Sequence, residues 1–155
     1  MRADCYDVYG NYFVKYLKEY ESRGSPVYAI TIQNEPLYAP SYPGMLMSAN
    51  EQINFIHYSL GPKLRQNGLN TKIVVYDHNY DDAGVQYVNT VLGDSNANQY
   101  IAGVGFHPYT TNINHAAMSM VHSRYNKEVW MTEAGSGTWI GKTHRIKYIS
   151  IYQFY

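Results

Sequence analysis

The chain repeats one local pattern several times: a short apolar run, a polar loop, and then a segment with helical periodicity. The apolar runs are rich in β-branched and aromatic residues, as buried strands are, and they occupy residues 27–32, 72–77, 101–107 and 128–132. Strands that alternate with helices require a parallel sheet joined by crossovers. The repeat therefore predicts an α/β fold built from successive strand and helix units.

Helices are expected before and between these strands. The segment 12–23 has amphipathic periodicity, Gly24 is well placed to end it, and shorter helices are predicted at 85–92 and 115–124. The predicted apolar face of the first helix consists of Phe13, Tyr16, Leu17 and Tyr20.

A longer helix is predicted after the first strand. Ser48 and Glu51 have the spacing of a capping box, which marks a helix start. Gly61-Pro62 should bend this helix, and Gly68 should end it. Its predicted apolar face consists of Ile53, Ile56, Leu60 and Leu64.

Two architectures fit a parallel sheet of this kind, a (β/α)₈ barrel and a doubly wound open sheet. The strand spacing is close to the roughly 31 residues per unit of a 250-residue barrel. No glycine-rich phosphate loop follows any strand, and polar residues follow every strand. We therefore expect a partial TIM barrel, because four strands supply half of the eight, and keep the doubly wound sheet as the alternative.

Composition narrows the class of partner. Twelve Lys and Arg balance twelve Asp and Glu, so the chain has no charge pattern of a nucleic-acid binder. No stretch reaches the roughly 18 apolar residues of a membrane span, and no signal peptide is visible. Eighteen Tyr and two Trp are many for this length. Aromatic rings suit a neutral ligand such as a sugar, although tyrosines also fill ordinary cores.

Two glutamates directly follow predicted strands. Glu35 comes after the first strand and Glu133 after the last. In a barrel the carboxyl ends of all strands meet at one face, so these side chains should converge there. Glycoside hydrolysis needs one carboxylic acid to protonate the leaving oxygen and a second carboxylate to attack or to activate water. The pair therefore predicts a glycosidase site.

Several segments together carry a family resemblance. Residues 10–140 are similar to glycoside hydrolase family 30 in the stretches YAITIQNEP, FIHYSLGPKLRQNGL, KIVVYDHNY, GVGFHPY and VWMTEAGSG. The resemblance implies a retaining β-glycosidase whose strands four to seven of eight lie in this chain. It assigns residues 1–141 to a partial barrel domain and leaves 142–155 as a tail without a recognised pattern.

The resemblance also implies roles for individual residues. Glu35 would be the general acid/base and Glu133 the nucleophile, and Asn34 would bind the sugar 2-hydroxyl. From the residues alone, the alternative for Asn34 is that it stabilises the turn before proline. A mechanism of this type needs no metal or organic cofactor.

Five further residues are predicted to bind substrate. His107 and Tyr109 match a His-x-Tyr motif near the nucleophile, and the Tyr109 hydroxyl could also orient Glu133. Asp77 and His78, with Asn79, match the polar end of the fifth strand, where a carboxylate and an imidazole could tune Glu35 instead of binding substrate. Trp139 could stack on a sugar ring. A zinc site formed by His78, His107 and Asp77 is the disfavoured alternative, because no zinc-binding motif is present.

The expected substrate is a β-linked glucan or glucoside. The motifs after the first two strands favour an endo-β-1,6-glucanase, with glucosylceramidase or a non-catalytic carbohydrate-binding relative as alternatives. The family implies an extracellular parent protein that supplies the missing barrel strands, so activity of the isolated chain is doubtful.

Overall fold

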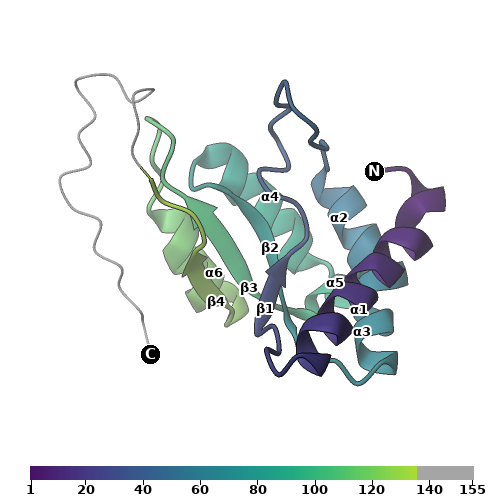
Figure 1. Ribbon diagram of the computed structural model, residues 1–155. Coiled ribbons are helices and arrows are strands. Elements are labelled where there is room, and N and C mark those ends of the chain that lie inside the picture. The colour runs from purple at the N-terminus through teal and green to yellow at the C-terminus, as the bar shows by residue number, and fades with distance from the viewer. Residues whose placement is uncertain (136–155) are drawn as a thin grey trace.

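A computed structural model describes residues 1–135, which form a four-stranded parallel sheet with helices packed against it (Figure 1). The strands are β1 (Ala29–Thr31), β2 (Lys72–Asn79), β3 (Ile101–His107) and β4 (Glu128–Met131). Their order in the sheet is β1-β2-β3-β4, and each neighbouring pair is parallel. A doubly wound sheet reverses its strand order at a switch point, whereas this sheet does not. The observed order is that of a barrel.

The strand predictions are confirmed in number and place, with differences at the ends. β3 has the predicted bounds, β2 extends to Asn79, and β1 is shorter than predicted because pairing with β2 begins at Ala29. No helix of the described part is long and apolar enough to cross a membrane.

Side chains on the outermost strands meet across the sheet. The Tyr28 ring, next to β1, stacks on Trp130 of β4 with ring centroids 5.8 Å apart. Lys72 lies between them, with its ammonium 4.7 Å from the Tyr28 centroid and an ion pair to Glu128. In a flat sheet, strands three positions apart are separated by roughly 14 Å. The side chains of the two outermost described strands therefore meet on one face of the sheet, as they would on the inner side of a barrel wall.

The first helix begins earlier than predicted. A 3₁₀ turn (Ala3–Cys5) leads into α1 (Tyr6–Ser22). The prediction for Tyr16 and Tyr20 was wrong, because these rings are 40% and 44% exposed. The helix is rotated so that its buried face consists of Gly10, Phe13, Val14 and Leu17.

The C-terminus of α1 agrees with the prediction. Gly24 has a φ of 76°, and the Ser25 amide donates to the Tyr20 carbonyl at 3.0 Å. This left-handed cap is the ending that glycine favours.

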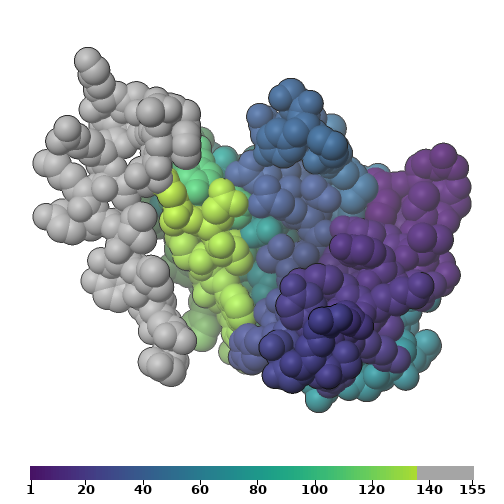
Figure 2. All heavy atoms as spheres, viewed as in Figure 1, coloured from purple at the N-terminus to yellow at the C-terminus, as the bar shows by residue number. Residues whose placement is uncertain are grey.

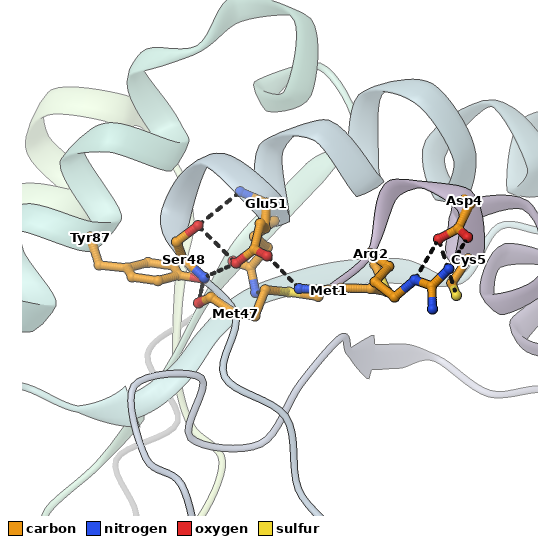
Figure 3. Close-up of polar contacts among 9 residues, drawn as sticks. Met1, Arg2, Asp4, Cys5, Met47, Ser48, Glu51 and Tyr87 are labelled. Atoms are coloured by element: carbon orange, nitrogen blue, oxygen red, sulfur yellow. Dashed lines mark hydrogen bonds and ion pairs between the residues drawn. The ribbon is translucent and has the colours of Figure 1, made fainter.

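The capping box at Ser48 is present and opens α2 (Ala49–Phe55), as Figure 3 shows. The Ser48 hydroxyl accepts from the Glu51 amide, and the Glu51 carboxylate accepts from the Ser48 amide. Tyr87 secures the preceding residue, because its hydroxyl donates to the Met47 carbonyl at 3.0 Å. These hydrogen bonds therefore fix the position of Met47 and Ser48, where the long loop after β1 ends.

The predicted irregularity at Gly61-Pro62 takes the form of a π-helical segment. Residues Ile56–Leu60 are π-helical, and α3 (Gly61–Gln66) follows. Proline lacks the amide that would donate to the carbonyl four residues earlier, so the helix changes its hydrogen-bond register there. Gly68 ends the helix with a φ of 67°, as predicted.

The remaining helices pack behind the sheet in Figure 1. They are α4 (Asp82–Gly93), a short α5 (Ser95–Asn98) that the sequence did not predict, and α6 (Ala116–Tyr125). Asp81 and Asp94 cap α4 and α5 by accepting from backbone amides. The core between these helices and the sheet includes Tyr76, Tyr87, Val88, Val91, Val104, Phe106 and Val121.

Candidate active site

The predicted acid/base lies in an unusual backbone conformation. Glu35 follows β1 and has a φ of 46°, in the left-handed region that non-glycine residues rarely adopt. Its amide donates to the Asp77 carbonyl at 2.9 Å, so the loop is tied to the end of β2. Such strain persists only where surrounding contacts hold it, and it is frequent at functional sites.

The end of β2 is irregular in the same way. Tyr76 and Asp77 have φ values of 70° and 59°, and the register between β2 and β3 shifts at this point. A bulge of this kind redirects a side chain. The Asp77 carboxylate is buried, accepts the Thr132 hydroxyl at 2.5 Å and faces His107 at 3.1 Å.

His107 connects the two irregular strand ends. Its Nε2 lies 3.1 Å from Asp77 Oδ1, its Nδ1 lies 3.1 Å from Glu35 Oε1, and its side chain is 1% exposed. Burial lowers the pKa of His107, but hydrogen bonds with these two carboxylates outweigh burial and raise the pKa above its ordinary value.

Burial acts in the opposite sense on Asp77. It raises the pKa of this carboxyl, but hydrogen bonds from His107, Thr132 and Thr31 outweigh burial and leave the pKa below its ordinary value. The buried Asp77 is therefore held in its ionised form.

Tyr109 links the other predicted catalytic residue to this cluster. Its amide donates to Asn79 Oδ1 at 2.9 Å, which fixes the start of the loop after β3. Burial raises the pKa of its phenol, and a hydrogen bond with Glu133 raises it further. Glu133 is exposed after β4, and its charge also acts on His107. Glu35 and Glu133 therefore lie at the same end of the sheet.

The other predicted residues have different surroundings. Asn34 is exposed, and His78 is half-buried with an Nδ1 that has no hydrogen-bond partner among the described residues. Burial lowers the pKa of His78, so its ring is neutral at pH 7. Trp139 and the predicted domain boundary at residue 141 lie outside the described residues.

The loop after β1 protrudes from the molecule at the end where the carboxyl ends of the strands lie. Figure 2 shows this loop in blue, and the residues around β4 in yellow-green. Tyr38 and Tyr42 of this loop are 49% and 65% exposed. Residues 1–135 contain no group of three His, Cys, Asp or Glu side chains placed to hold a metal ion.

Sequence reasoning missed two threonines that support this cluster. Thr132 donates a hydrogen bond to Asp77, and Thr31 helps to lower the pKa of Asp77. Asn79, which was expected at this end of the sheet, positions Tyr109. The available signal for the threonines was position: each of the two lies at or just beyond the carboxyl end of a strand. A threonine within or after an apolar strand is common, however, and gives no separate indication of a site.

Comparisons with known proteins agree on one family. Residues 2–152 match the model of the glycosyl hydrolase family 30 TIM-barrel domain. An endo-1,6-β-D-glucanase of Neurospora crassa is 40% identical over 127 residues, which are 81% of this chain and 26% of that protein. Putative glucosylceramidase 1 of Caenorhabditis elegans is 29% identical over 146 residues, which are 90% of this chain and 28% of that protein.

Solved structures show the same relationship. An endo-β1,6-glucanase superposes with a TM-score of 0.82 at 35% identity and covers 90% of this chain and 31% of its own. A family 30 subfamily 8 xylanase from Clostridium acetobutylicum superposes with a TM-score of 0.68 at 25% identity, covering 85% of this chain and 32% of its own. The chain thus spans about a quarter of the length of the curated relatives it matches.

Proposed function

Because the chain belongs to glycosyl hydrolase family 30, we propose that it carries the catalytic pair of a retaining β-glycosidase. The observation that carries the proposal is the placement of Glu35 and Glu133. They follow the first and last described strands of the sheet, His107 lies 3.1 Å from Glu35, and Glu133 raises the pKa of both His107 and Tyr109. Glycoside hydrolysis requires two carboxyl groups at one site, one on each side of the scissile bond.

The proposed reaction has two steps. Glu133 attacks the anomeric carbon while Glu35 protonates the departing oxygen, and a glycosyl-enzyme forms. Water then replaces Glu133, and Glu35 accepts the proton of this water, so the anomeric configuration is retained. Asn34 is exposed and immediately precedes Glu35 in the sequence. In this proposal it binds the sugar 2-hydroxyl.

We propose β-1,6-glucan as the substrate. Support comes from the relatives, since endo-1,6-β-D-glucanases reach 40% identity, whereas the putative glucosylceramidases reach at most 32%. Glucosylceramidase is the second candidate, and it rests on those weaker matches. Release of sugar from a β-1,6-glucan and from a glucosylceramide, measured side by side, would distinguish the two.

The four strands correspond, in this proposal, to strands four to seven of a barrel that needs eight. The pair would then act only in a completed barrel. A suitable test protein is a chimera in which this chain replaces its matching segment in the Neurospora crassa endo-1,6-β-D-glucanase. The chimera is expected to cleave β-1,6-glucan, while the 155-residue chain alone is not.

Variants of the chimera test the two roles. Glu35→Gln should lower kcat by about 10²–10⁴-fold, because it removes the general acid. Glu133→Gln should abolish the glycosyl-enzyme that a 2-fluoro glucoside traps, as seen by mass spectrometry. Glu21→Gln, at an exposed position of α1, is the matched control and should leave both readouts unchanged. A trapped intermediate in the Glu133→Gln chimera would contradict the nucleophile assignment.

A further inference from the structure

The buried imidazole of His107 faces a carboxylate oxygen with each of its ring nitrogens. Both separations are 3.1 Å, from Nδ1 to Glu35 and from Nε2 to Asp77. A neutral imidazole carries one N–H and can donate to only one of these oxygens. Both contacts can be hydrogen bonds only if a second proton is present, either on Nδ1 or on the Glu35 carboxyl.

Asp77 determines which nitrogen carries the first proton. Its Oδ1 already accepts the Thr132 hydroxyl at 2.5 Å, and its side chain is 8% exposed. Donors that converge on a buried carboxylate favour its ionised form. Nε2 therefore carries the proton directed at Asp77, and a hydrogen bond between His107 Nδ1 and Glu35 Oε1 needs a second proton on one of these two atoms.

On the basis of the proposed function, we propose that Glu35 and His107 share one proton, and that Asp77 is a positioning residue that fixes the imidazole for this exchange. With the proton on Glu35, His107 is neutral and its Nδ1 accepts. With the proton on Nδ1, the two groups form an ion pair. One O–H bond breaks as one N–H bond forms, so the total charge is the same in both arrangements.

The shared proton would serve both steps of the reaction. When Glu35 protonates the leaving oxygen, its carboxylate is left facing the lone pair of a neutral His107 at 3.1 Å. A proton on either of these two atoms restores the hydrogen bond between them. The attacking water then gives its proton to Glu35, while its oxygen bonds to the anomeric carbon and the bond to Glu133 breaks.

The neighbouring titratable groups do not compete for this proton. The His78 ring lies 6.5 Å from His107, centroid to centroid, and burial lowers the pKa of His78, so it stays neutral. The Tyr109 ring lies 5.9 Å away, and burial and Glu133 raise its pKa, so it also stays neutral. Glu133 contributes a negative charge, which favours a proton on His107.

Nitrogen-15 NMR of the imidazole-labelled 155-residue chain tests the proposal without any need for catalysis. Between pH 5 and 8 the His107 Nε2 resonance should be that of a protonated ring nitrogen. The Nδ1 resonance should lie between the protonated and unprotonated positions. Glu35→Gln should move Nδ1 to the unprotonated position and leave Nε2 unchanged, because the amide cannot share a proton. The exposed His122 provides a reference in the same spectra.

The Asp77→Asn variant tests whether Asp77 positions the imidazole of His107 or only stabilises the fold. It preserves shape but removes the charge, and the proton on Nε2 should become exchangeable between the two ring nitrogens. Thr132→Val keeps the Asp77 charge and should leave the nitrogens of His107 close to their original positions. A His107 Nδ1 resonance that stays unprotonated at every pH and does not respond to Glu35→Gln would overturn the proposal. A shared proton in a chain whose chimera cleaves no glycoside would refute the proposed function alone.

Discussion

Replacing Gly105 with alanine tests how closely the strands must approach at the site. Gly105 lies in β3, and a Cβ at this position would be 2.8 Å from Thr132 Oγ1 and 3.2 Å from Asp77 Oδ1. These two atoms are hydrogen-bonded to each other at 2.5 Å, so neither can move without breaking that bond. The added methyl group therefore has no space unless the Thr132–Asp77 contact opens.

The expected effect follows from three contributions. Overpacking destabilises by about 1–3 kcal/mol, and a lost hydrogen bond to a charged group by about 1.5–3 kcal/mol. The reduced entropy of the unfolded chain offsets about 0.4–1 kcal/mol. We expect Gly105→Ala to lower the free energy of unfolding by about 2–4 kcal/mol, which moves a urea midpoint by about 1–2 M.

Urea unfolding followed by circular dichroism measures this difference directly. Gly93→Ala is the matched control, because a Cβ there has no atom within 4 Å and the residue ends α4. The control should be more stable than the original chain by about 0.5–1 kcal/mol, since alanine favours a helix. Equal midpoints for the Gly105→Ala and Gly93→Ala chains would refute the reasoning.

Two smaller predictions concern the start of α2 (Figure 3). In the isolated 155-residue chain, the Met1 ammonium and the Ser48 amide lower the pKa of Glu51 from 4.5 to about 2. The stabilisation by Glu51 is therefore present above pH 4.5 and disappears as the pH falls toward 2. Glu51→Gln should therefore lower the free energy of unfolding by about 1 kcal/mol at pH 7 and by less at pH 3, and a difference independent of pH would contradict this. Tyr87→Phe should lower it by about 1–1.5 kcal/mol in thermal unfolding, because the Met47 carbonyl loses its donor, while Tyr58→Phe at an exposed position should have no effect.

The sequence predicted the order of the elements because the strands and helix ends carry strong local signals. Gly24 and Gly68 end their helices because glycine readily adopts the positive φ that both positions have. Ser48 begins a helix because its hydroxyl accepts a hydrogen bond from a backbone amide of the first turn. The face of α1 was predicted less well. Tyrosine counts as apolar in a periodic pattern, but its ring can also lie in water. Tyr16 and Tyr20 therefore do not show which face of α1 is buried.

The sequence also predicted which strand ends carry the polar residues, but not the bonds between them. That Glu35 and Asp77 lie near His107 follows from the parallel sheet. The backbone conformations do not follow from it, because glutamate, tyrosine and aspartate all prefer negative φ. Only the tertiary contacts around Glu35, Tyr76 and Asp77 select the left-handed conformation.

These three left-handed residues explain how a short β1 can hold the carboxyl group of Glu35 in place. Each conformation costs about 1–3 kcal/mol, and two of the residues, Glu35 and Asp77, are joined by the 2.9 Å bond from the Glu35 amide to the Asp77 carbonyl. The compensating contacts come from β3 and the residue after β4, through His107 and Thr132. The carboxyl group of Glu35, the proposed acid/base, is therefore positioned by interactions within residues 1–135. In the proposed complete barrel, further strands would add contacts around a carboxyl group that this part of the chain already orients.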